Sequence, residues 1–143
     1  MDNLRLTLRL LPEQFAICKL AADAELPSWG AGGSLSSATR TPTELTILCD
    51  ERRVPDDVTA ERGWRLLAVE GPIAFDAVGV IAALAVPLAR ARVSILVVAS
   101  CVTDYVAVPE ASLASARGAL EAAGHVIVAS RGVSSSDDRA ASR

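Results

Sequence analysis

The stretch from residue 64 to residue 128 constrains the fold most, because strands and helices alternate along it at short spacing. A strand is followed by an alanine-rich helix, by two strands joined through a tight turn, by a second helix and by a last strand. These elements are expected at residues 64–70, 77–91, 94–100, 105–108, 110–123 and 125–128. The order βαββαβ is that of a ferredoxin-like unit, in which two helices cover one face of an antiparallel sheet.

Local signals set the boundaries of these elements. Gly71-Pro72 breaks the first strand, Asp76 is a suitable N-cap for the first helix, and Gly124 ends the second helix. The apolar, β-branched run at 94–100 predicts a central strand that is buried on both faces.

The residues before this stretch predict a smaller set of similar elements. Strands are expected at 4–11, 15–20, 34–39 and 45–48, with one helical turn inside the loop 21–33 and a short helix within 50–63. An offset of 60 residues places Ser34 on Ser94 and Glu44 on Asp104. We therefore predict an α+β chain of two tandem ferredoxin-like units with antiparallel sheets and helices on one face. The first unit spans residues 1–60 with a shortened helix, the second spans 61–129, and 130–143 form a disordered tail.

Composition excludes several classes of function. The chain of 143 residues has a net charge of −3 and a pI near 5.1, so no nucleic-acid partner is expected. Its longest apolar run, 77–89, is too short to span a bilayer, and charges near the amino terminus argue against a signal peptide. We expect a cytoplasmic protein without a membrane partner. Cys18, Cys49 and Cys101 have no metal-ligand spacing and are expected to be buried free thiols.

The sequence also lacks the motifs of an enzyme. It contains no nucleophile elbow, no phosphate-binding glycine loop and no paired metal ligands, and its one histidine, His125, stands alone. No catalytic residue, cofactor or metal is therefore predicted. An enzyme that uses Asp104 as a general base is left as an alternative.

One segment resembles a known family. GPIAFDAVGVIAALAVPLARARVSILVVASCVTDYVAVPEASL is similar to the second ACT domain of small bacterial tandem-ACT proteins related to the CASTOR arginine sensors. LRLLPEQFAICKL and SLSSATRTPTELTILC resemble the first half of those proteins, so the resemblance covers about residues 4–128. It implies a regulatory protein that binds an amino acid or another small effector between two ACT units.

In that family the ligand lies beside the first helix of the second unit and the aspartate of its hairpin. The resemblance therefore implies a site built from the helix start, the hairpin and a strand of the first unit. The corresponding residues are Asp76, Ala77, Val78, Gly79, Ser100, Cys101, Thr103, Asp104, Ser36, Ser37, Ala38 and Thr39. The arginine sensors carry an acid where this chain has Ala77 and an aromatic residue where it has Cys101. These differences argue against arginine and leave the ligand open.

The residues themselves are compatible with such a site. A helix N-terminus offers N–H donors to a ligand carboxylate, Asp104 offers a carboxylate to its ammonium group, and the hydroxyls of Ser100 or Thr103 could complete the contacts. The alternatives are that Asp76 is only an N-cap and that Asp104 only shapes a turn. A module that forms oligomers or binds a protein without any small ligand is the competing function. Open sheet edges predict a homodimer in either case.

Overall fold

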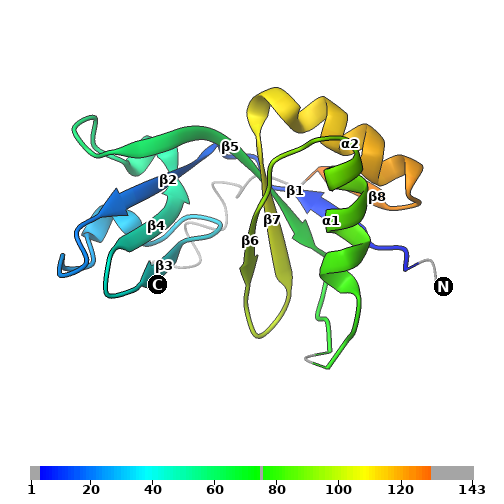
Figure 1. Ribbon diagram of the computed structural model, residues 1–143, viewed down its shortest axis with the longest axis horizontal. Coiled ribbons are helices and arrows are strands. Elements are labelled where there is room, and N and C mark those ends of the chain that lie inside the picture. Colours follow the sequence, from blue (N-terminus) through cyan, green and yellow to red (C-terminus); the bar gives the residue numbers. More distant parts are fainter. Residues whose placement is uncertain (1–3, 75, 130–143) are drawn as a thin grey trace, which may run out of the picture.

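The computed structural model describes residues 4–74 and 76–129, which form eight strands and two α-helices (Figure 1). The predicted α+β class is confirmed. The tail predicted at 130–143 lies outside the described residues. The strands are β1 Thr7–Leu10, β2 Phe15–Leu20, β3 Ser37–Arg40, β4 Leu45–Asp50, β5 Ala60–Val69, β6 Leu96–Ala99, β7 Asp104–Pro109 and β8 Val126–Ala129. The helices are α1 Val80–Arg90 and α2 Leu113–Ala122.

Strand β5 joins two groups of strands. Its first residues pair with β2, which continues through β4 to β3, and its last residues pair with β7 on one side and β1 on the other. β6 extends the sheet beyond β7, and β8 extends it beyond β1. The resulting orders are β3-β4-β2-β5 and β6-β7-β5-β1-β8. β5 is ten residues long, enough to serve both groups.

Strand β1 lies between β5 and β8, and the sequence pattern did not indicate this position. It pairs antiparallel with β5 and parallel with β8, so the second group of strands is not purely antiparallel. A parallel neighbour is possible because α2 carries the chain from β7 back to the start of β8. Residues near the amino terminus thus complete the sheet that the second half of the chain forms.

The two helices cover one face of the second group of strands (Figure 1). In α1, residues spaced by four positions are buried: Val80, Leu84 and Leu88. In α2, Ala116 and Leu120 face the same core. Against them pack the inward side chains of the strands: Leu8, Leu67, Val69, Val106 and Val108. Aliphatic residues therefore build this core.

The first group of strands has no α-helix within residues 4–59. Ten more residues separate β5 from β6 than separate β2 from β3, and α1 has eleven residues. A 3₁₀ turn, Ser28–Gly30, stands where the predicted shortened helix would be. The short helix expected within 50–63 is also only a 3₁₀ turn, Glu51–Arg53. The strands β3 and β4 recur as β6 and β7 at an offset of 59 residues, one less than predicted.

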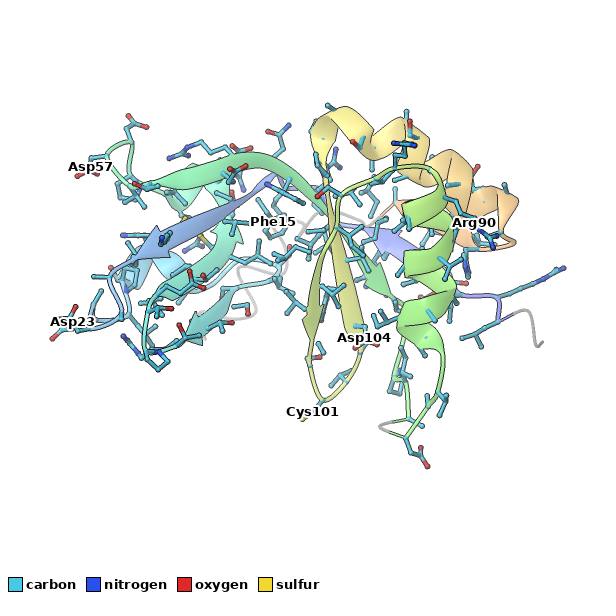
Figure 2. All side chains as sticks on the ribbon, viewed as in Figure 1. Phe15, Asp23, Asp57, Arg90, Cys101 and Asp104 are labelled. Atoms are coloured by element: carbon cyan, nitrogen blue, oxygen red, sulfur yellow. The ribbon has the colours of Figure 1, made fainter. Side chains whose placement is uncertain are left out.

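The face of the second group of strands that the helices do not cover packs on the first group of strands. Phe15 lies fully buried at the centre of this seam (Figure 2) and contacts an apolar cluster from both groups. Its buried members besides Phe15 are Leu11, Leu48, Leu66 and Ala107. Leu96 and Val98 of β6 also pack here, whereas Val97 points the other way and is 39% exposed.

The prediction that 94–100 is a central strand is therefore wrong. Among the strands that the structure describes, β6 pairs only with β7 and forms an edge of the sheet. The run is apolar because one face of β6 packs on the seam, while its other face stays largely exposed. An apolar run indicates that a strand contacts a core. In β6 this contact is on one face only.

Asp50 at the end of β4 makes the stability of the protein depend on pH. Its buried carboxylate accepts bonds from the Arg52 side chain, with Nη2 to Oδ2 at 2.7 Å, and from the Arg52 backbone N–H at 3.0 Å. The hydrogen bond from the Arg52 side chain lowers the pKa of Asp50. A lowered pKa in the folded state stabilises the protein above the ordinary pKa, near 4, and this contribution disappears as the pH falls through the lowered value.

We expect Asp50→Asn to be less stable than the wild type at neutral pH, with a difference that shrinks below about pH 4. Asparagine keeps an acceptor for the Arg52 backbone N–H but has no charge. Urea denaturation of both proteins between neutral and acidic pH measures the difference. A constant difference across this range would show that ionisation of Asp50 does not contribute. Asp57→Asn, at an exposed position, is the control.

Candidate functional site

A pocket of about 190 Å³ lies between the segment that precedes α1 and the turn that joins β6 to β7. Figure 2 shows Cys101 and Asp104 on this hairpin, beside the amino-terminal end of α1. The pocket is lined by Ile73, Ala74, Ala77, Val80, Ala99, Ser100, Cys101, Val102, Thr103 and Asp104. It is smaller than the roughly 300–1,000 Å³ of pockets for drug-sized ligands, so it suits a small molecule.

The hairpin turn holds its own shape through hydrogen bonds. The Ser100 hydroxyl donates to the Thr103 carbonyl at 2.9 Å and accepts from the backbone N–H groups of Val102 and Thr103. The Thr103 hydroxyl donates to the Val69 carbonyl at 2.6 Å. Both hydroxyl hydrogens are therefore already donated within the chain. Of the ligand contacts predicted for these hydroxyls, donation is therefore not available in this geometry.

Among the described residues, Asp104 is the only charged one that lines the pocket. It is the first residue of β7, opposite Ala99 of β6, and is half-buried. Within residues 4–74 and 76–129, its carboxylate has no hydrogen bond or ion pair with another side chain. A partly desolvated carboxylate without a partner favours a cationic group beside it.

Helix α1 begins at Val80, which lines the same pocket. Its N-cap is Gly79 with φ +89°, a left-handed conformation that favours glycine, and no side chain caps the helix. The prediction that Asp76 is the N-cap is therefore wrong: Asp76 lies in a turn that ends before the helix, where Ala77 N–H bonds to the Ala74 carbonyl. The first-turn N–H groups of α1 lack a side-chain acceptor, which is suitable for an anionic group.

The structure brings together part of the predicted site. Ala77, Ser100, Cys101, Thr103 and Asp104 line the pocket, whereas Asp76, Val78 and Gly79 adjoin it without lining it. Ser36, Ser37, Ala38 and Thr39 lie at and on β3, in the other group of strands, and no residue of the described range 4–59 lines this pocket.

Sequence reasoning missed half of the lining residues. Ile73, Ala74, Val80, Ala99 and Val102 are apolar and belong to no motif. The sequence did contain one indication for Ile73. Gly71-Pro72 follows the end of β5, so the chain must turn back over the sheet at this point. The turn is fixed where Ile73 N–H donates to the Val102 carbonyl at 3.0 Å.

The three cysteines differ in environment. Cys18 and Cys49 are buried as predicted, and burial raises both pKa values, that of Cys49 to about 11. Cys101 is exposed at the hairpin turn, so the prediction that it is buried is wrong. No group of three metal-binding side chains gathers in the described part of the chain, and no helix there is long and apolar enough to cross a membrane.

Comparison with known proteins places this site in an ACT domain. Residues 59–122 match the ACT domain family model, and residues 13–57 match the model of an N-terminal domain. The crystal structure of protein Atu0741 from Agobacterium tumefaciens is 32% identical, with a TM-score of 0.85 over 92% of this chain and 98% of that chain. No protein with curated annotation matches the sequence.

Two more distant structures share the fold. A protein of unknown function from Vibrio cholerae, VC0802, described as a possible transport protein, is 20% identical over 83% of this chain and 90% of that chain, with a TM-score of 0.68. Aspartate kinase from Clostridium acetobutylicum, described as an allosteric enzyme, is 14% identical over 78% of this chain and 33% of that chain, with a TM-score of 0.59. The fold is therefore ACT-like.

Proposed function

Because the chain belongs to the protein family of Atu0741 and contains an ACT domain at residues 59–122, we propose that it is a regulatory protein that binds an amino acid. The observation that supports this most directly is the unpartnered Asp104 carboxylate in a small pocket beside the uncapped start of α1. An amino acid carries an ammonium group and a carboxylate a few ångströms apart. The pocket offers the Asp104 carboxylate to the ammonium group and the start of α1 to the carboxylate.

The two charges of the ligand would be bound by different elements. The ammonium group donates to Asp104, and the carboxylate accepts from N–H groups in the first turn of α1. No lysine or arginine within residues 4–74 and 76–129 lines the pocket, so in this proposal the backbone donates to the carboxylate. Ala74, Ala77 and Ala99 leave room for a small ligand side chain. Ser36 to Thr39 do not line this pocket, and the proposed site does not include them.

We also propose that the chain is a tandem of two related units of the CASTOR-like type, divided near residue 60. The common offset of 59 residues between β3 and β6 and between β4 and β7 supports this division. So do the matching strand orders β3-β4-β2 and β6-β7-β5. In this proposal the first unit has a 3₁₀ turn, Ser28–Gly30, where the second has α1, and its turn Glu51–Arg53 corresponds to the 3₁₀ turn Glu110–Ser112 that precedes α2.

Titration calorimetry against the twenty amino acids tests the proposed ligand class. We expect saturable heat with at least one of them and binding weaker by about 10- to 150-fold in Asp104→Asn, because a charge-assisted hydrogen bond contributes about 1.5 to 3 kcal/mol. Asp23→Asn, an exposed position in the first unit, is the matched control and should bind as the wild type does. Equal affinity in Asp104→Asn would contradict the assigned site.

An interaction module without a ligand is the second candidate, and the sheet edges favour it. β3, β6 and β8 each end the sheet that the described residues form, and β6 and β8 carry no charged residue, which favours pairing at these edges. We therefore propose a homo-oligomer, with or without a ligand. No heat with any amino acid, together with a stable oligomer in solution, would favour this second function over the first.

A further inference from the structure

More than half of the side chains that line the pocket are apolar. Ten described residues line it, and six of them have side chains of carbon and hydrogen only: Ile73, Ala74, Ala77, Val80, Ala99 and Val102. Val102 is 59% exposed, so the lining includes apolar surface that faces water. Removing such surface from water is favourable in proportion to its area. A ligand side chain of carbon and hydrogen would therefore gain affinity from these residues.

The neutral polar side chains of the lining leave little for a ligand to bind. The Ser100 hydroxyl donates to the Thr103 carbonyl and accepts from the backbone N–H groups of Val102 and Thr103, at 3.3 and 3.2 Å. The Thr103 hydroxyl donates to the Val69 carbonyl. A hydroxyl has one hydrogen and two lone pairs, so Ser100 is fully used and Thr103 has no hydrogen to donate. Cys101 adds a thiol, which is only a weak donor.

The charge of the pocket also restricts the ligand side chain. Figure 2 shows Asp104 on the side of the hairpin that is nearest to α1, and the proposed function uses its carboxylate for the ammonium group. A second cationic group on the ligand would have to share that carboxylate. A side-chain carboxylate would be repelled by Asp104, and no lysine or arginine of the described residues lines the pocket to offset this. A neutral side chain avoids both costs.

The volume of the pocket limits the length of the ligand side chain. The pocket holds about 190 Å³, and a water-sized group occupies about 30 Å³ in a liquid, so about six such groups fit. A free alanine molecule has about this many non-hydrogen atoms, and valine has slightly more. Ala74, Ala77 and Ala99 are exposed, so a small excess can extend toward solvent. An aromatic side chain is much too large to be enclosed.

We infer that the pocket selects a neutral amino acid with a short aliphatic side chain, of the size of alanine to valine. The inference rests on the proposed function, because it takes the positions of the ammonium group and the carboxylate from it. The ligand side chain then contacts the segment before α1, the start of α1 and the hairpin, through Ala77, Val80 and Val102. Other amino acids are rejected because they bury polar groups without partners or exceed the available space.

Titration calorimetry with single amino acids tests this ligand class. Valine and threonine have nearly the same shape, and we expect valine to bind about 10- to 100-fold more tightly because the added hydroxyl finds no free donor or acceptor. Alanine should bind about 10- to 200-fold more tightly than glycine, which lacks the methyl group. Lysine, aspartate and phenylalanine should each bind at least about 100-fold more weakly than valine.

A variant of the lining tests where the ligand side chain lies. Ala77→Val adds apolar volume to the pocket and no polar atom, so it should weaken valine binding by about 10-fold or more and alanine binding by less. Ala82→Val makes the same change at an exposed position of α1 that does not line the pocket. This matched control should bind both ligands as the wild type does. Circular dichroism confirms that each variant is folded.

The possible results separate the ligand class from the proposed function. No saturable heat with any amino acid overturns the proposed function and this inference with it. Binding that is lost in Asp104→Asn but is tightest for a charged, amide or aromatic amino acid overturns the ligand class alone. An equal loss of valine and alanine binding in Ala77→Val, or no loss of either, overturns the size limit assigned to this pocket.

Discussion

Phe15→Ala is expected to lower the free energy of unfolding by about 3 to 5 kcal/mol, the usual cost of removing a fully buried phenylalanine side chain. Phe15 has no exposed surface and lies at the seam between the two groups of strands. The other members of its cluster come from β2, β4, β5, β6 and β7, from the end of β1 and from the segment before β3, so no single loop can move in to fill the cavity. Among the aromatic residues within 4–74 and 76–129, no other side chain is completely buried.

Chemical denaturation of Phe15→Ala and Phe15→Leu measures the free energy of unfolding of both variants. The comparison separates the effect of removing apolar volume from the effect of changing the shape of the side chain. Leucine keeps most of the apolar volume and should cost less than about 1.5 kcal/mol. Val126→Ala removes an exposed apolar side chain on β8 and should change stability by less than about 0.5 kcal/mol. A cost below about 1 kcal/mol for Phe15→Ala would mean that the seam does not hold the two groups of strands together.

The strands were predictable where their signal was local. β2 and the hairpin of β6 and β7 are found within one or two residues of their predicted positions, because turn residues and alternating burial mark their ends. The position of β1 was not predictable from pattern. Its neighbours are β5 and β8, more than fifty residues away along the chain, and hydrophobic periodicity contains no information about such partners.

The start of α1 shows how a plausible local rule can mislead. Asp76 has the right chemistry for an N-cap, but Gly79, three residues later, can adopt the left-handed conformation that redirects the chain into the helix. The same shift moved the first-turn N–H groups to Val80 and beyond. The sequence therefore predicted a ligand site at a helix start and placed that start three residues too early.

The charged residue of the candidate site could be predicted from the sequence, whereas the apolar residues that line it could not. Asp104 follows from a hairpin signal and from the chemistry of an ammonium group. Ser100 and Thr103 were expected to offer hydroxyls, but their hydrogens are used within the turn and toward Val69. Hydrogen bonds of this kind depend on tertiary placement, which side-chain identity alone cannot indicate.

His125 supplies the other large prediction, because its imidazole forms hydrogen bonds with two backbone groups from separate parts of the chain. Its Nδ1 accepts from Leu6 N–H at 3.1 Å, and its Nε2–H donates to the Ala83 carbonyl at 2.9 Å. An N–H can only donate and a carbonyl can only accept, so the two bonds fix the tautomer. The Ala83 carbonyl would normally accept from the N–H four residues later, but that residue is Pro87. The histidine therefore replaces the hydrogen bond that the proline cannot make.

His125→Leu is expected to lower the free energy of unfolding by about 2 to 6 kcal/mol, because two partly buried backbone groups lose their partners at about 1 to 3 kcal/mol each. Leucine is of similar size and apolar, so the imidazole's hydrogen bonds are the main loss. Because Val80, at the start of α1, lines the pocket, the same variant should also weaken binding of any ligand found by calorimetry.

Pro87→Ala provides the decisive comparison. It returns an N–H to position 87, four residues after Ala83, so the carbonyl regains a helical partner and His125→Leu should cost about 1 to 2 kcal/mol less in that background. Urea denaturation of the wild type, both single variants and the double variant gives this coupling energy. Leu6 N–H stays unsatisfied in both backgrounds, so the rescue should be partial. Additivity within about 0.5 kcal/mol would show that the histidine and the proline are independent, and full rescue would show that the bond to Leu6 contributes nothing.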